Sequence, residues 1–144
     1  MKKGVILDTG PLVAFLNRRD NFHQWALTQW GQIAPPMLTC EAVISETCFL
    51  LGSTMTGTES VLQLLERNIV SISFCLNDNL HPVMKLLARY SSVPMSLADA
   101  CLVRMSELNP KSQVFTLDSD FNFYRKNIRR VIPVVTLPPA KPVA

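Results

Sequence analysis

Short apolar runs that stop at a polar or acidic residue are the feature that most constrains the fold of this chain. Runs of this kind predict strands over 4–7, 37–39, 69–74, 114–117 and 131–135. The first run stops at Asp8 and the fourth at Asp118. Most of these runs are continuous rather than alternating, which is typical of a parallel sheet covered on both faces. The sequence therefore predicts the α/β class, a three-layer α/β/α sandwich with a central parallel sheet.

Segments with helical periodicity lie between most of these strands. They predict helices over 12–16, 22–33, 41–51, 58–66, 78–88 and 96–108. The helix over 41–51 has apolar residues on nearly every face, which indicates a central, buried helix. Trp25 and Trp30 in the second helix are expected to anchor the core.

The length and composition indicate one globular domain. The chain has 144 residues, of which 48% are apolar and 17% charged, enough for one sizeable core but not for two ordinary ones. We expect the domain to cover 1–137 and the proline-rich tail over 138–144 to fray. The formal net charge of +3 favours a polyanionic partner without requiring one.

The cysteines and the N-terminus bear on the compartment. Cys40, Cys48, Cys75 and Cys101 lie in apolar stretches and form no CxxC pair, so we expect buried free thiols in a reducing compartment rather than a zinc cluster. The apolar run after Met-Lys-Lys stops at Asp8, which does not suit an export signal. No stretch approaches the roughly 20 apolar residues that cross a bilayer, and we expect a soluble, cytoplasmic protein.

Two carboxylates stand on apolar helix faces. Glu46 shares its predicted face with Val43 and Phe49, and Asp99 shares its face with Leu102 and Val103. Burying an unpaired carboxylate costs several kcal/mol, so each side chain needs a positive partner. A divalent cation meets this need; the alternatives are an arginine salt bridge for Glu46 and a first-turn aspartate stabilised by the helix dipole for Asp99.

Asp8 and Asp118 each follow a predicted strand. Taken alone, either is explained by capping of the next turn. In a parallel sheet, however, strand ends and flanking helices converge at one edge, where four carboxylates repel unless metal lies between them. Oxygen ligands without histidine suit Mg²⁺ or Mn²⁺, and the matching chemistry is phosphodiester hydrolysis by metal-activated water.

At these residues the sequence resembles the PIN-domain family, and within it the VapC-like toxin ribonucleases. The matching motifs are Leu7-Asp8-Thr9-Gly10-Pro11-Leu12, Ser45-Glu46, Ser96-Leu97-Ala98-Asp99-Ala100 and Thr116-Leu117-Asp118-Ser119-Asp120-Phe121. The resemblance covers about residues 4–135. It implies an Mg²⁺- or Mn²⁺-dependent ribonuclease that forms homodimers and is often blocked by an antitoxin protein.

The resemblance also implies roles for individual residues. Asp8, Glu46 and Asp99 match the three core acids of the family, and Asp118 matches a fourth, more variable acid that Asp120 can replace or assist. Small polar residues beside the acids are expected to orient water or a carboxylate; these are Thr9, Ser96 and Thr116.

Basic and aromatic residues offer contacts to RNA. The basic candidates for holding phosphates are Arg18, Arg19, Arg125, Lys126, Arg129 and Arg130, and a solvated basic loop is the alternative for each. Phe121, Phe123 and Tyr124 can stack on bases, although core packing is the better expectation for Phe121.

Two other functions stay open at this point. A phospho-acceptor receiver domain also places an aspartate at a strand end, but it calls for an acidic pair and a late lysine that this sequence does not supply. The other is a catalytically inactive PIN fold that serves as a binding module.

Overall fold

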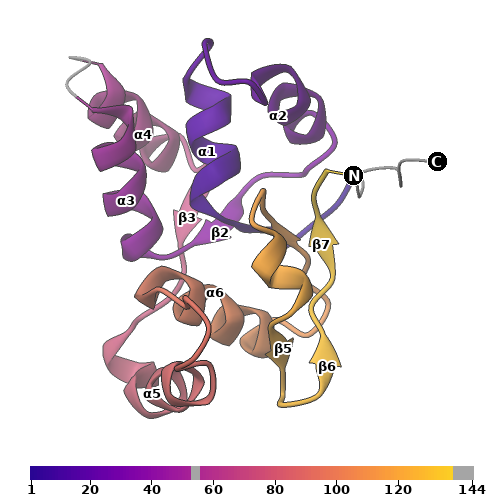
Figure 1. Cartoon of the computed structure of the whole chain (residues 1–144). Helices are drawn as coiled ribbons and strands as arrows, with labels where there is room; N and C mark the ends of the chain where they lie inside the picture. The colour runs from indigo at the N-terminus through magenta and orange to yellow at the C-terminus, as the bar shows by residue number, and fades with distance from the viewer. Residues whose placement is uncertain (53–55, 138–144) are drawn as a thin grey trace.

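Five short parallel strands form the centre of the fold in the computed structural model, which describes residues 1–52 and 56–137 (Figure 1). The strands are β1 (Ile6–Leu7), β2 (Met37–Thr39), β3 (Val70–Ile72), β4 (Val114–Phe115) and β7 (Val134–Val135). Their order across the sheet is β3-β2-β1-β4-β7, and every neighbouring pair is parallel. The predicted parallel sheet is confirmed, whereas the predicted tail over 138–144 lies outside the described residues.

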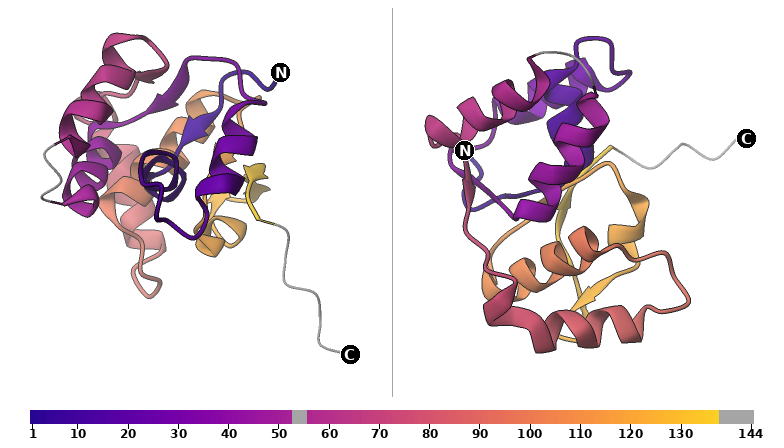
Figure 2. Two further views of the ribbon diagram at one scale, coloured as in Figure 1. Left: turned by 90° about the horizontal axis from the view of Figure 1, so that it is seen from above. Right: turned by 90° about the vertical axis from the view of Figure 1, so that its left-hand side faces the viewer.

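Helices cover both faces of this sheet. The first four are α1 (Thr9–Leu16), α2 (His23–Trp30), α3 (Glu41–Leu51) and α4 (Gly57–Glu66). They gather on one side, while α5 (Leu80–Arg89) and α6 (Leu97–Leu108) lie on the other (Figures 1 and 2). A 3-10 turn, η1 (Asn77–Asn79), leads into α5. The three-layer α/β/α sandwich is therefore confirmed.

Aromatic side chains join the helices to the sheet. The rings of Trp25 and Trp30 lie with their centroids 5.5 Å and 6.3 Å from the ring of Phe115, which is fully buried on β4. Trp30 also stacks on Phe15 at 3.9 Å. Tilted and edge-to-face pairs of this kind add to the free energy of simple burial. The two tryptophans anchor α2 to the core, as predicted.

The strand order decides against the receiver-domain alternative. When the five parallel strands are numbered along the chain, the order is 3-2-1-4-5, whereas receiver domains have the order 2-1-3-4-5. In this sheet the direction of winding reverses between β1 and β4. Ligands of open α/β sheets bind at the carboxyl ends of the strands beside such a reversal, which here lies next to Asp8 and Asp118.

The last predicted strand, over 131–135, is wrong in its extent. Only Val134–Val135 joins the sheet, while Val131 belongs to a hairpin of β5 (Arg125–Lys126) and β6 (Arg130–Val131). A tight turn at positive φ reverses the chain between these two strands. Pro133, which has no N–H, then separates the hairpin from β7. A 3-10 turn, η2 (Ser119–Asn122), precedes the hairpin.

The prediction that residues 41–51 form a central helix is also wrong. Helix α3 buries Val43 and Thr47, whereas Phe49 is 81% and Leu50 55% exposed. The helix lies in the outer layer and packs only its inner face against α1, α4 and α6. The apolar residues on several faces of α3 therefore do not indicate that several faces of this helix are buried.

The cysteines are only partly buried. Cys40 and Cys101 are buried, Cys48 is half-buried and Cys75 is exposed, and all four thiols are free. The expectation of four buried thiols is wrong for Cys75 because its residue lies in the loop after β3 rather than in the strand itself. Within the described residues, no helix has the length and apolar character needed to span a membrane.

Candidate functional site

Asp8 lies where β1 ends and α1 begins. Its side chain is only 7% exposed and caps α1, with Oδ1 accepting a hydrogen bond from the Thr9 N–H at 2.8 Å. Its other oxygen, Oδ2, accepts a hydrogen bond from the Thr116 hydroxyl at 2.7 Å. The capping interpretation of Asp8 is therefore confirmed.

Thr116 links the ends of the two central strands. Its hydroxyl donates to Asp8 and accepts from the Asp118 N–H at 2.8 Å. The Asp118 Oδ1 in turn accepts from the Asp120 N–H at 2.9 Å. This chain of bonds fixes the segment after β4 beside the segment after β1. A small polar residue at 116 was predicted to orient a carboxylate, and it does bond to Asp8.

Gly10 allows this close approach. A Cβ atom at position 10 would lie 3.2 Å from the Leu117 Cβ, a distance that forces one of the two segments to give way. The first turn of α1 therefore packs directly on the segment between Thr116 and Asp118.

Asp99 enters the site from the start of α6. It forms a capping box with Ser96, in which the Ser96 Oγ accepts from the Asp99 N–H and the Asp99 Oδ2 accepts from the Ser96 N–H, both at 3.0 Å. Capping boxes satisfy two N–H groups that a helix start leaves without partners. The Tyr124 hydroxyl also donates to the Asp99 Oδ2, at 3.3 Å.

The pKa shifts show that these carboxylates act on one another. Burial raises the pKa of Asp8 to about 6 against the hydrogen bonds from Thr116 and Thr9, and the charges of Asp99 and Asp118 raise it further. Burial also raises the pKa of Asp99, with a smaller contribution from the charge of Asp118. The pKa of the Tyr124 phenol is raised by burial and then by the same acidic groups, Asp120 included.

No basic side chain balances these charges. Within residues 1–52 and 56–137, the one ion pair joins Arg104 to Glu107 in the last turns of α6, away from the helix start that carries Asp99. Three carboxylates from different elements thus share one edge of the sheet with no cation beside them. The electrostatic potential of these carboxylates favours a positively charged ligand at this edge of the sheet.

Glu46 is placed differently from the prediction. Its side chain is exposed on α3 and makes no hydrogen bond or ion pair to another described residue. The expectation of burial on an apolar stripe is wrong because the residues that α3 buries are Val43 and Thr47, whereas Glu46 is exposed. An exposed carboxylate needs no buried partner, so burial no longer argues for Glu46 as a ligand.

These side chains offer oxygen atoms, the type of ligand that a hard divalent cation prefers. Their arrangement among the described residues, however, does not form a ready-made metal site. The Asp99 Oδ1 and the Asp118 Oδ2 accept no hydrogen bond from the described part of the chain, and the buried Thr9 hydroxyl has no partner there either. Such an orphaned group is usually met by water or a ligand. However, no three Asp, Glu, His or Cys side chains among the described residues are arranged to hold one ion.

A cleft of about 780 Å³ opens beside the carboxylates. It lies between the start of α3, the loop after β3 and the start of α6, and Cys40, Leu97 and Cys101 belong to its lining. The charge of Asp8 acts on the Cys40 thiol, which places Asp8 near one wall. The cleft gives a bound molecule room next to the acidic edge.

The basic residues proposed to contact RNA divide into two groups. Arg18, Arg19, Arg129 and Arg130 are exposed. Arg125 and Lys126 instead contact backbone carbonyl groups. The Arg125 Nη1 donates to the carbonyl groups of residues 122–124, and the buried Lys126 Nζ donates to the Pro110 carbonyl at 3.1 Å. Lys126 thus connects the hairpin to the segment after α6, whereas the contacts of Arg125 are local.

The aromatic residues near Asp118 are mostly core. Phe121 and Tyr124 are fully buried and meet edge to face at 5.3 Å. Core packing of Phe121 is confirmed, and base stacking by Tyr124 is excluded by its burial. Phe123 is 58% exposed and can meet a base. The contact of Tyr124 with Asp99 was missed, because nothing in a sequence pairs two residues 25 positions apart.

Comparisons with known proteins agree with this geometry. The family described as the PIN domain matches residues 5–127. A search of curated proteins gives no match. Among solved structures, the chain is similar to VapC20 of Mycobacterium tuberculosis, a toxin that cleaves the sarcin-ricin loop, with a TM-score of 0.68 and 21% sequence identity. The match covers 81% of this chain and 91% of the other.

Proposed function

The chain belongs to the PIN-domain family, and on this premise we propose that it is a ribonuclease that hydrolyses phosphodiester bonds with the help of Mg²⁺ or Mn²⁺. The proposed ligands are Asp8, Glu46, Asp99 and Asp118, with Asp120 assisting. Asp8, Asp99 and Asp118 are supported by their convergence at one edge of the sheet. Glu46 is supported by its match to the family motif alone.

One observation carries the proposal: a carboxylate at the end of β1 is buried beside two others, and no cation of the described residues pairs with them. The pKa of Asp8 is raised to about 6 even though two hydrogen bonds favour its charged form. A divalent cation removes this penalty because it is the strongest local positive charge available to oxygen ligands.

The residues of the chain position this chemistry. When bound, the metal polarises the scissile phosphate and activates water. Thr116 and the Thr9 N–H hold Asp8 in place, and the capping box with Ser96 holds Asp99. Asp99 and Asp118 each keep one carboxylate oxygen without a hydrogen bond to another described residue, and such an oxygen can ligate or accept the proton of water.

We further propose that the protein works in the cytoplasm as the toxin of a toxin–antitoxin pair and forms a homodimer. The similarity to a structure named as a toxin supports the first point. The second is supported by apolar side chains left at the surface of α2 and α4, where Leu27 is 39% and Leu62 52% exposed. Sedimentation of the purified chain measures its oligomeric state.

The test is cleavage of a mixed set of structured and single-stranded RNAs in Mg²⁺, Mn²⁺ or EDTA. Asp8→Asn and Asp99→Asn are each expected to abolish metal-dependent cleavage. Asp78→Asn is the matched control, because Asp78 is an exposed carboxylate in η1. If the wild type cuts RNA equally well in EDTA, or if Asp8→Asn retains full activity, the proposal fails.

The inactive PIN-fold binding module is the second candidate. The exposure of Glu46 and the lack of a ready three-ligand set among described residues favour it. Calorimetric titration with Mn²⁺ separates the two: a site that binds Mn²⁺ in the wild type but not in Asp8→Asn supports the nuclease, whereas no binding in either supports the module.

A further inference from the structure

A second, basic pocket lies at the other end of α6. It has a volume of about 410 Å³ and is walled by α5, the C-terminal half of α6 and the tip of the β5–β6 hairpin. Lys85, Arg89 and Arg104 line it, with Glu107 as its one acid and His81 at its edge. Three cations and one carboxylate leave a net charge of +2 when His81 is neutral.

The charges on α5 follow one face of the helix. His81, Lys85 and Arg89 are spaced four residues apart, and all three are exposed. Their side chains make no hydrogen bond or ion pair to another described residue. Like charges at this spacing repel and destabilise a helix. An anion in the pocket relieves the repulsion between Lys85 and Arg89.

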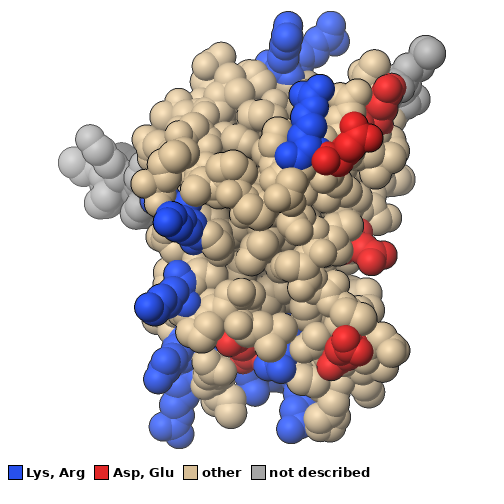
Figure 3. All heavy atoms as spheres, turned by 180° about the vertical axis from the view of Figure 1, so that it is seen from behind, with Lys and Arg blue, Asp and Glu red and all other residues tan. Residues whose placement is uncertain are grey.

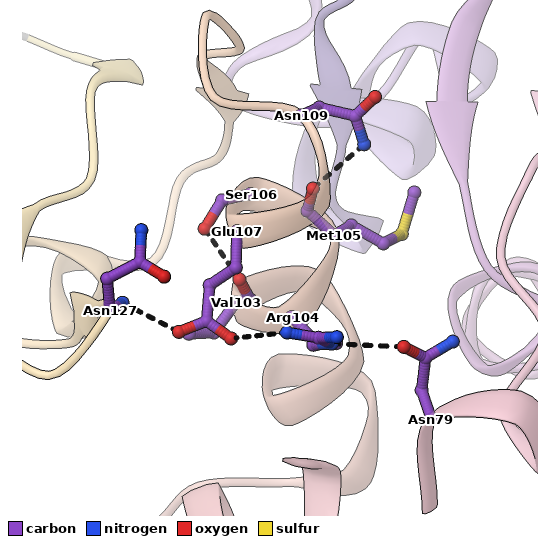
Figure 4. Close-up of polar contacts among 8 residues, drawn as sticks. All are labelled: Asn79, Val103, Arg104, Met105, Ser106, Glu107, Asn109 and Asn127. Atoms are coloured by element: carbon purple, nitrogen blue, oxygen red, sulfur yellow. Dashed lines mark hydrogen bonds and ion pairs between the residues drawn. The ribbon is translucent and has the colours of Figure 1, made fainter.

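Arg104 is held in place on the facing helix (Figure 4). Its Nε donates to the Asn79 Oδ1 at 3.0 Å, and its Nη1 pairs with the Glu107 Oε1 at 3.3 Å. The other Glu107 oxygen, Oε2, accepts from the Asn127 N–H at 2.6 Å. Both oxygens of Glu107 are therefore occupied by Arg104 and the hairpin, and Lys85 and Arg89 have no acidic partner in the described part of the chain.

The hairpin tip gives the pocket a rigid rim. Asn127 and Ile128 both have positive φ, at 48° and 73°, a region that a β-branched residue such as isoleucine rarely adopts. The bond from the Asn127 N–H to Glu107 holds this turn beside α6. Ile128 is 64% exposed and lines the pocket. Strained turns of this kind persist where surrounding contacts fix them.

We propose that this pocket is a second phosphate-binding site, which holds the backbone of the RNA substrate at a distance from the acidic edge. The inference rests on the proposed ribonuclease function. Helix α6 connects the two sites, because Asp99 lies in its first turn and Arg104 and Glu107 follow five and eight residues later. At 1.5 Å per residue these are about 8 Å and 12 Å along the axis.

The distribution of charge over the molecule agrees with this assignment. Lys and Arg side chains gather along the lower end of the face in Figure 3, the end that carries α5 and the hairpin in Figure 1. Arg129 and Arg130 extend the basic surface along the hairpin. An RNA strand that enters the acidic edge can thus continue over positively charged surface.

The test is fluorescence anisotropy with a labelled 20-nucleotide single-stranded RNA in EDTA, which prevents metal-dependent cleavage, over a series of salt concentrations. The double variant Lys85→Gln/Arg89→Gln is expected to bind more weakly. Its plot of log affinity against log salt should also be shallower by about 1.4, since each phosphate contact to a single strand contributes about 0.7 to the slope. The charge-preserving Lys85→Arg/Arg89→Lys is expected to bind like the wild type.

The matched control is Arg67→Gln/Lys111→Gln, which removes the same net charge from exposed positions outside the pocket. An equal loss of slope in both double variants would mean that net charge alone matters, and it would overturn the inference. An unchanged slope in Lys85→Gln/Arg89→Gln would overturn it while leaving the ribonuclease proposal intact. Wild type that binds no RNA in this assay also overturns the inference, whereas the ribonuclease proposal is decided by the cleavage test.

Discussion

Replacement of Asp8 by asparagine is expected to change how the stability of this protein depends on pH. Burial raises the pKa of Asp8 in the folded state from an ordinary 3.8 to about 6. At about 1.4 kcal/mol per pKa unit, this difference corresponds to about 3 kcal/mol. Typical domains have a free energy of unfolding of about 5–15 kcal/mol, so the effect is large enough to measure.

The sign follows from proton binding. Below pH 3.8 the Asp8 carboxyl is protonated in both folded and unfolded chains. Between 3.8 and about 6 the folded protein keeps the proton that the unfolded chain has lost, so stability falls as the pH rises. Above about 6 the loss is complete. Asparagine does not titrate, so Asp8→Asn is expected to gain about 3 kcal/mol relative to wild type between pH 4 and pH 7.5.

Urea unfolding in EDTA at pH 4, 5, 6 and 7.5 measures this difference. The raised pKa of Asp99 lowers stability in both proteins over the same range and largely cancels in the comparison. Asp78→Asn is the control and should show no such trend. A difference between Asp8→Asn and wild type that stays constant with pH would refute the assignment of a costly buried charge to Asp8.

Three further predictions concern the surroundings of the carboxylates. Thr116→Val keeps the side-chain shape but removes the hydrogen bonds to the Asp118 N–H and to the Asp8 Oδ2, so urea unfolding should show a loss of about 2 kcal/mol, with Thr116→Ser near wild type. Ser96→Ala removes the helix cap that orients Asp99 and should cost about 1 kcal/mol in the same measurement. A thiol reagent should modify Cys75 in the native protein, and Cys40 and Cys101 only after unfolding.

Much of the fold could be predicted because its signals are local. The strand over 37–39 and the bounds of the helix over 41–51 each depend on neighbouring residues, and both are found as predicted. The hairpin of β5 and β6 could not be found in this way. Its turn places Asn127 and Ile128 at positive φ, and an isoleucine in that conformation is rare, so the sequence does not predict a turn there.

The same distinction between local and non-local signals applies to the residues of the candidate site. Asp8, Asp99 and Asp118 meet because strand ends and a helix start of a parallel sheet converge, and that geometry follows from the order of elements. Glu46 was misjudged because its apolar neighbours suggested burial, whereas the face that a helix buries depends on what packs against it. The contacts of Arg125 and Lys126 were missed for a related reason: their partners are backbone carbonyls that no sequence pattern displays.

The arrangement of charge along α6 sets the two proposed sites apart. At its start, Asp99 is held by hydrogen bonds from a serine and a tyrosine, and no cation lies near it among the described residues. Toward its end, Glu107 is fully engaged with Arg104 and the hairpin. A fold selected for stability alone would place a cation beside the first acid or replace Asp8 by a neutral residue. The uncompensated acids at one end and the surplus cations at the other therefore favour two kinds of ligand group, a metal ion and a phosphate, which a single RNA–metal complex supplies together.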